Sequence, residues 1–364
     1  MRMKTVVSLL LIAAMLFTAG CAKKPAEGEA AQQPDDLPTA APQATAQPEV
    51  TARPEGEQQA AAPETTALPG YTDAVPMSDV EMEKEVVIFF ESSIVAVPDV
   101  LQPVASGEKV SENGKAVIDY SNTEDGYVMI KFVGETDKRL KTQIVGPHTT
   151  YTYNLYKGEW GVFPLTDGNG AYQFKVFQNV TGSQYSLVLA DGCDVQLKDE
   201  FAPFLRPNQY VDYDRSSKAV EKARELTRDI SDPLEKVEVI YNFVITALTY
   251  DKEKAQTVKS GYLPDLDAVM DAGKGICFDY AALMTGMLRS QGIPCKMVFG
   301  YAGSAYHAWI SVWTEDEGWV DGVIFFDGTN WQRVDPTFAS SGNQSEEIMQ
   351  YIGNNSNYRE KYLY

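Results

Sequence analysis

The chain has 364 residues and a net charge of −20, with 51 Asp and Glu against 31 Lys and Arg. Nucleic acids and anionic membranes attract proteins through basic patches, so this balance argues against non-specific binding to either. The length exceeds that of one ordinary compact domain and favours two or three units, and 44% hydrophobic residues are enough to build their cores.

The first residues look like a bacterial lipoprotein signal. Arg2 and Lys4 give a positive start, and an apolar run over 5–20 follows that is shorter than the roughly 20 residues a membrane-spanning helix needs. We expect cleavage after residues 1–20 and lipidation of Cys21, which would anchor the protein to the membrane outside the cytoplasm. An ordinary signal peptide or a short membrane anchor is the alternative, because Thr18 stands where Leu is commoner.

Residues 21–76 are rich in Pro, Ala, Gln and Glu and carry almost no large apolar side chain. Such a segment cannot bury enough surface to offset the entropy of ordering it, so we expect a disordered tether. It would reach on the order of 40 Å as a coil and roughly 170 Å when fully extended. Its composition indicates a spacer rather than a recognition element.

Residues 77–200 are expected to form an all-β sandwich domain. Short runs rich in Val, Ile, Tyr and Phe alternate with turn signals such as Asn113-Gly114 and Asp191-Gly192. The predicted strands are 86–90, 116–120, 128–132, 149–156, 171–177 and 185–189. His148 follows a Gly-Pro pair and is interpreted as a turn or edge residue, and Cys193 has no partner at metal-ligand spacing. The domain is therefore predicted to be an accessory or binding module.

Residues 201–364 begin with helical spacing of apolar residues. A first helix is predicted over 217–230, and Asp232-Pro233 is typical of the start of a second helix. A third, short helix should cover 266–272 and end at Gly273. The Tyr-rich end of the chain, with Tyr351, Tyr358, Tyr362 and Tyr364, is expected to pack on this domain.

Three short motifs of this domain carry a Cys, a His and an Asp, in that order along the chain. Gly275-Ile276-Cys277 leads into a predicted helix that ends at Gly292. Tyr306-His307-Ala308-Trp309 alternates like a strand, and Asp335-Pro336-Thr337 closes a further strand. This order of Cys, His and Asp resembles the transglutaminase-like, papain-related superfamily, and with its first residues the chain resembles bacterial transglutaminase-like lipoproteins. The resemblance implies an α+β papain-like/transglutaminase-like C-terminal domain with a Cys277, His307 and Asp335 catalytic triad.

The chemistry can also be built from the residues. A thiolate attacks carbonyl carbon, and catalytic cysteines reach pKa values of about 3.5–7.5 at helix N-termini beside an imidazolium. A shift of about 3 units needs roughly 4 kcal/mol, of which a helix end supplies about 0.3–1 kcal/mol, so a cation in contact has to provide the rest. His307 is the histidine in the same domain as Cys277 and would later protonate the leaving amine.

An acidic residue should orient the other imidazole nitrogen. Asp321 and Asp327 each precede Gly, as in turns, whereas Asp335 precedes Pro and so favours extended backbone. Asp335 is also the residue that the resemblance implies. We expect the backbone N–H of Cys277 to stabilise the oxyanion, with Tyr250 or another upstream aromatic as a guess for a second donor.

Plainer readings remain for each residue. Cys277 alone could be a small buried hydrophobe and His307 a core residue, but their joint pattern favours an active site. Cys295 is predicted to lie in the core, and a disulfide with Cys193 is unsupported. Without CxxC or His-pair spacing we expect no metal and no cofactor. Asp279, Tyr280, Trp309 and Trp313 are expected to pack or to line the cleft.

These patterns predict a cysteine peptidase or amidase acting on a peptide or protein substrate in the cell envelope. One alternative is cross-linking by a protein-glutamine γ-glutamyltransferase, which differs only in that an amine replaces water as the acceptor. The other is a non-catalytic binding or scaffold module on the same fold, since a fold alone does not prove activity.

Overall fold

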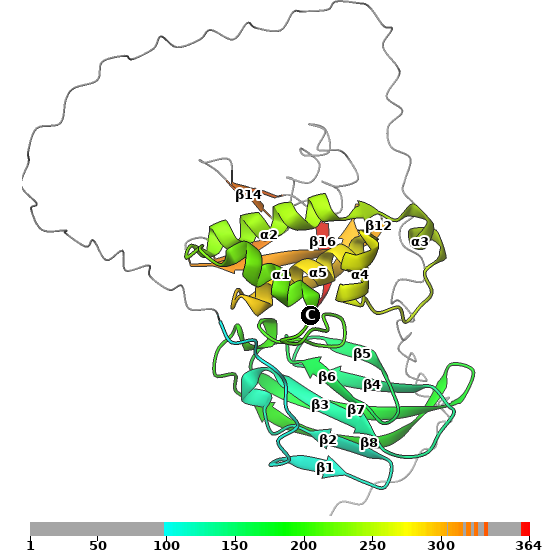
Figure 1. Ribbon diagram of the computed structural model, residues 1–364. Coiled ribbons are helices and arrows are strands. Elements are labelled where there is room, and N and C mark those ends of the chain that lie inside the picture. The colour runs from blue at the N-terminus through cyan, green and yellow to red at the C-terminus, as the bar shows by residue number, and fades with distance from the viewer. Residues whose placement is uncertain (1–97, 304, 316–317, 322–323, 327–330, 334–357) are drawn as a thin grey trace, which may run out of the picture.

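The computed structural model describes residues 98–303, 305–315, 318–321, 324–326, 331–333 and 358–364 (Figure 1). The predicted signal peptide, Cys21, the tether and the strand at 86–90 lie outside the described residues, as do Asp327, Asp335 and Tyr351. No helix in the described part is long and apolar enough to cross a membrane.

The first half of the described chain forms two four-stranded antiparallel sheets, seen in the lower part of Figure 1. One sheet has the order β1-β2-β3-β6 and the other β5-β4-β7-β8. Their bounds are β1 Val110–Glu112, β2 Ala116–Asp119, β3 Tyr127–Phe132, β4 Leu140–Val145, β5 Thr150–Leu155, β6 Trp160–Pro164, β7 Gly170–Thr181 and β8 Gln184–Val195. Buried side chains of both sheets belong to one hydrophobic core, as a β-sandwich requires.

Five of the predicted strands are confirmed within the described residues, whereas the turn predicted at Asp191-Gly192 is wrong. Both residues lie inside β8 and pair with Phe174 and Gln173 of β7. Glycine is needed there because a Cβ on Gly192 would lie 2.4 Å from the carbonyl oxygen of Tyr172. The glycine therefore serves a close approach between strands, not a reversal of the chain.

The second half is built around one buried helix, α5. Its bounds and those of its neighbours are α1 Lys218–Thr227, α2 Pro233–Ala247, α3 Lys252–Thr257, α4 Leu266–Ala272 and α5 Cys277–Ser290. Helices α1, α2 and α4 pack against α5, which also packs against the sheet. All side chains of α5 are buried, so this helix is the centre of the domain (Figure 1).

The sheet beside α5 is antiparallel and has the order β13-β12-β11-β16. Its strands are β11 Cys295–Ala302, β12 Ala305–Thr314, β13 Gly318–Asp321 and β16 Tyr358–Leu363, and a separate pair is formed by β14 Ile324–Phe326 and β15 Trp331–Arg333. The predicted packing of the tyrosine-rich end is confirmed for its described part, because β16 pairs with β11 and Tyr364 is buried.

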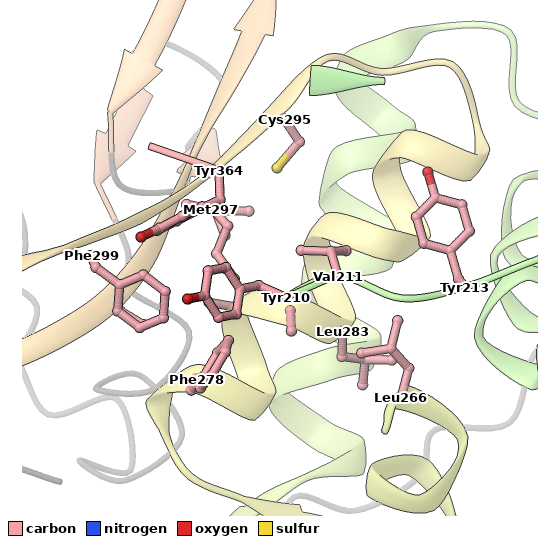
Figure 2. Packing of buried hydrophobic residues seen from close by; sticks show 14 of the residues in the cluster. Tyr210, Val211, Tyr213, Leu266, Phe278, Leu283, Cys295, Met297, Phe299 and Tyr364 are labelled. Atoms are coloured by element: carbon pink, nitrogen blue, oxygen red, sulfur yellow. The ribbon is translucent and has the colours of Figure 1, made fainter. Parts of the chain in front are cut away.

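Aromatic side chains join the two halves. The ring of Tyr364 lies 5.8 Å from Tyr153 of β5, 4.5 Å from Tyr210 and 5.6 Å from Phe299 of β11, measured between centroids. Phe278, the second residue of α5, continues the cluster at 4.9 Å from Phe299 (Figure 2). The sandwich and α5 therefore share one continuous core.

Candidate active site

Cys277 is the first residue of α5, as the sequence predicts. Ile276 precedes it in extended backbone (φ −97°, ψ 175°), which turns the chain abruptly into the helix. The Cys277 side chain is 6% exposed and belongs to the hydrophobic core. The first N–H groups of a helix have no acceptor within it, and that of Cys277 has none among the described residues. An unpaired donor and the positive end of a helix thus meet at this thiol.

Short backbone ladders fix the turn before Cys277. Strand β10 (Lys274–Gly275) runs parallel to β9 (Thr249–Tyr250), with Gly275 beside Tyr250. The N–H of Thr249 donates to Gly273 at 3.0 Å, and the N–H of Asp251 donates to Gly275 at 2.9 Å. Gly273 ends α4 with a left-handed φ of 60°, which glycine adopts without strain. Tyr250, named above as a guess for the second oxyanion donor, therefore lies next to the turn that carries Cys277.

Asp279 is more than a packing residue. Its carboxylate is fully buried and accepts hydrogen bonds from the backbone N–H of Ile276 at 2.8 Å, Lys254 Nζ at 2.7 Å and the Tyr262 hydroxyl at 2.5 Å. This is half of a capping box, since Ile276 has no polar side-chain atom to return the bond. Burial, followed by the charge of Asp279, raises the pKa of Tyr262, which keeps its hydroxyl a donor.

His307 lies in β12, as predicted, and is buried at 3% exposure. It pairs with Gly300 of β11, and its ring stacks near Trp309 with centroids 6.2 Å apart at 25°. Ala308, on the opposite side of the strand, belongs to the same hydrophobic core as Cys277. Strand β12 packs against α5, so the elements that carry Cys277 and His307 are neighbours.

The structure brings together the two elements that carry Cys277 and His307. Asp335, the expected third member of the triad, lies outside the described residues.

The other described cysteines are not equivalent to Cys277. Cys193 is half-buried and Cys295 fully buried, and both are free thiols, which rules out a disulfide between them in this structure. Burial raises the pKa of Cys295 to about 11 and also raises that of Cys193. The prediction that Cys295 lies in the core is confirmed, and neither thiol lies at a helix start.

A cavity of about 680 Å³ lies elsewhere, between the β-sandwich and the helices. Carboxylates such as Glu159, Asp212 and Asp265 line it, together with Tyr156 and Trp160. Neither Cys277 nor His307 contributes to its wall, so the cavity is separate from the candidate active site.

Residues 220–322 match the family described as Transglutaminase-like superfamily, a segment that includes both Cys277 and His307. A protein-glutamine gamma-glutamyltransferase of Pseudomonas aeruginosa is 28% identical over 107 residues, which cover 25% of this chain and 14% of that protein. The uncharacterized protein YebA of Bacillus subtilis is 26% identical over 117 residues, covering 27% of this chain and 16% of that protein. The match thus spans less than a fifth of either curated relative.

Among solved structures, a candidate cysteine protease from Cytophaga hutchinsonii is 16% identical and covers 70% of this chain and 83% of its own, with a TM-score of 0.33. The family match rests on the segment that holds α5 and β12, and the fold around them is α+β behind a sheet-rich region. The chain carries a domain of the transglutaminase-like superfamily.

Proposed function

We propose that the transglutaminase-like domain is a thiol acyl-transfer enzyme whose most favoured reaction is hydrolysis of peptide or side-chain amide bonds. The observation that carries this is the position of Cys277 on the first turn of a buried helix inside the family-matched segment, with an N–H that has no acceptor among the described residues. A thiolate is the nucleophile of such reactions, and helix starts favour it.

In the proposed reaction the sulfur of Cys277 attacks the amide carbonyl carbon and forms a tetrahedral intermediate. The backbone N–H of Cys277 donates to the oxyanion. His307 takes the thiol proton and returns it to the leaving amine as the C–N bond breaks, and Asp335 holds the imidazole in the required tautomer. Water, deprotonated by His307, then attacks the thioester and releases the acid and the free thiol.

Transfer to an amine is the second candidate. It is favoured by the similarity to a relative named protein-glutamine gamma-glutamyltransferase. The same acyl-enzyme would form from a glutamine side chain, and a lysine amine would replace water as the acceptor. Hydrolysis is preferred because water needs no dedicated acceptor site.

Alkylation by iodoacetamide tests the nucleophile. We expect Cys277 to react at about pH 6 at least ten times faster than a cysteine in the unfolded chain, as activated cysteines do. His307→Ala and Asp335→Asn should slow the reaction, while Cys193, followed by mass spectrometry in the same sample, serves as the internal control. Labelling of Cys277 no faster than in urea, and unaffected by His307→Ala, would support a non-catalytic scaffold instead.

The reaction class can be read from cell-envelope extracts. Wild-type protein is compared with Cys277→Ala for release of new peptide termini and for incorporation of a biotinylated amine. New termini in the wild type alone support hydrolysis, and amine incorporation in the wild type alone supports cross-linking.

The location is proposed from the first residues alone. We propose that Cys21 is lipidated and holds the protein on the outer side of the membrane through the segment 21–76. Cys21→Ser should move the protein from the membrane to the soluble fraction or stop its processing. An unchanged membrane fraction would contradict lipidation of Cys21.

A further inference from the structure

The buried carboxylate of Asp279 lies two residues after Cys277, at the positive end of α5. A negative charge there stabilises a helix, but it also opposes a second negative charge at the same place. An active Cys277 requires that second charge, because the thiolate is the attacking form. An isolated Asp279 would therefore work against the nucleophile that the proposed function needs.

Lys254 supplies the opposing charge. Its Nζ lies 2.7 Å from Asp279 Oδ2 and 2.7 Å from the hydroxyl of Tyr262, which itself donates to Asp279 Oδ1. The Lys254 side chain is 26% exposed, whereas that of Asp279 is fully buried. Water therefore reaches the ion pair from the lysine and not from the carboxylate. Every described contact of the carboxylate comes from a donor, as a buried anion requires.

The same carboxylate also fixes the turn. Asp279 Oδ2 accepts the N–H of Ile276, and Gly275 lies so close that a Cβ there would be 2.6 Å from Asp279 Cβ. A second ion pair, Lys274 Nζ with Asp251 Oδ2 at 3.1 Å, joins β10, which precedes α5, to the N-cap residue of α3. Asp279 thus joins the turn that carries Cys277 to α3 and to the loop after α3.

We propose that Lys254 and Asp279 are positioning residues for Cys277. Asp279 holds the turn, and Lys254 cancels its charge so that the start of α5 stays positive toward the sulfur. This inference rests on the proposed function, in which Cys277 reacts as a thiolate. Tyr262 donates a hydrogen bond to the second carboxylate oxygen of Asp279.

The test compares two alkylating agents of nearly equal size, neutral iodoacetamide and anionic iodoacetate. In both reactions the thiolate sulfur forms a bond to the CH₂ carbon and iodide leaves. The thiolate fraction cancels in the ratio of the iodoacetate rate to the iodoacetamide rate, so this ratio reports the local charge at Cys277. Mass spectrometry of the peptide containing Cys277 measures this rate ratio in the full chain. If Lys254 and Asp279 only held the backbone in place, replacing them in a folded variant would leave the ratio unchanged.

We expect Lys254→Met to lower the ratio about two- to fivefold, since an uncancelled carboxylate repels iodoacetate. Asp279→Asn, which keeps an oxygen for the N–H of Ile276, should raise it by a similar factor. Lys254→Arg should retain the wild-type ratio, and the double variant Lys254→Met/Asp279→Asn should return toward it. Lys157→Met, which removes an exposed ion-paired lysine of the β-sandwich, is the matched control and should change nothing.

Unchanged ratios in folded Lys254→Met and Asp279→Asn would overturn the inference. If Lys254→Met does not fold, the comparison of Asp279→Asn with wild type decides. The proposed function fails separately, when wild-type Cys277 reacts no faster than an unfolded cysteine, because that result concerns the rate with iodoacetamide and not the ratio.

Discussion

Arg289 offers a direct test of how the domain is held together, through the substitution Arg289→Met. The guanidinium is 2% exposed and sits near the end of α5. Its Nε and Nη2 donate to the carbonyl of Cys295 at 2.9 and 2.7 Å, Nη1 donates to Arg206 at 2.7 Å, and Nη2 also donates to Tyr364 at 2.7 Å. One side chain thus joins α5 to β11, to the linker before α1 and to the last residue.

The loss of stability expected for Arg289→Met can be estimated from these hydrogen bonds. Hydrogen bonds of a charged group contribute about 1.5–3 kcal/mol each, but the values do not add, and removing the desolvated guanidinium recovers part of the loss. Burial desolvates the guanidinium and lowers the pKa of Arg289. Methionine fills a similar volume yet leaves the carbonyl of Arg206 without this donor. We therefore expect the free energy of unfolding to fall by about 3–5 kcal/mol.

Urea unfolding followed by far-UV circular dichroism measures this loss. Arg139→Met is the matched control, because Arg139 donates a single exposed hydrogen bond, to the carbonyl of Gly182 at 2.7 Å. It should cost less than about 1 kcal/mol. A loss for Arg289→Met no larger than that of the control would refute the reasoning, and would mean that the buried carbonyls find other donors.

Three further predictions concern stability and use the same urea assay. Burial raises the pKa of Cys295 from 9.0 to about 11, so the stabilisation from its neutral thiol is complete below about pH 9 and is lost as pH rises to about 11. The advantage of wild type over Cys295→Ala should therefore shrink by about 2 kcal/mol between pH 8 and 10.5, and an unchanged difference would contradict this cause. Gly273→Ala should cost about 1 kcal/mol because φ is +60° while the nearest atom, the oxygen of Ala247, leaves room at 3.5 Å; no loss would exclude backbone strain. Tyr364→Ala should cost about 3–5 kcal/mol through the cavity it opens, and a loss under about 1 kcal/mol would show that the end of the chain is dispensable.

Local sequence signals predict where several helices of the second half begin and end. Asp232 caps α2 through the N–H of Leu234, and Gly273 ends α4, because caps depend on side chains within a few residues. Strand β4 was missed, although Leu140, Thr142 and Ile144 point inward in alternation. Its inward threonine is polar and is satisfied by the carbonyl of Lys175 on β7, a partner that only the folded sheet supplies.

The candidate site also combines residues that local sequence predicts with residues that only the fold brings together. Cys277 and His307 belong to short motifs, so their elements could be predicted from spacing alone. The role of Asp279 could have been read from its place three residues after the N-cap. Its partners Lys254 and Tyr262 could not, since they lie 25 and 17 residues away on α3 and in the following loop. Only the fold brings that lysine to the start of α5.

The β-sandwich packs directly on the α+β half of the chain, so a linker is not all that joins them. Tyr210 lies 5.6 Å from Tyr153 of β5 and 5.7 Å from Phe278, and its ring is buried by both halves together. Because close-packed interiors transmit changes of volume, a shift of the sandwich would reach Phe278, the residue next to Cys277. Separating the halves would also expose Tyr210 and Tyr364 to water, at about 1.5–3 kcal/mol for each large apolar side chain. The sandwich therefore acts on the candidate active site as part of its supporting core, and the two halves should unfold together.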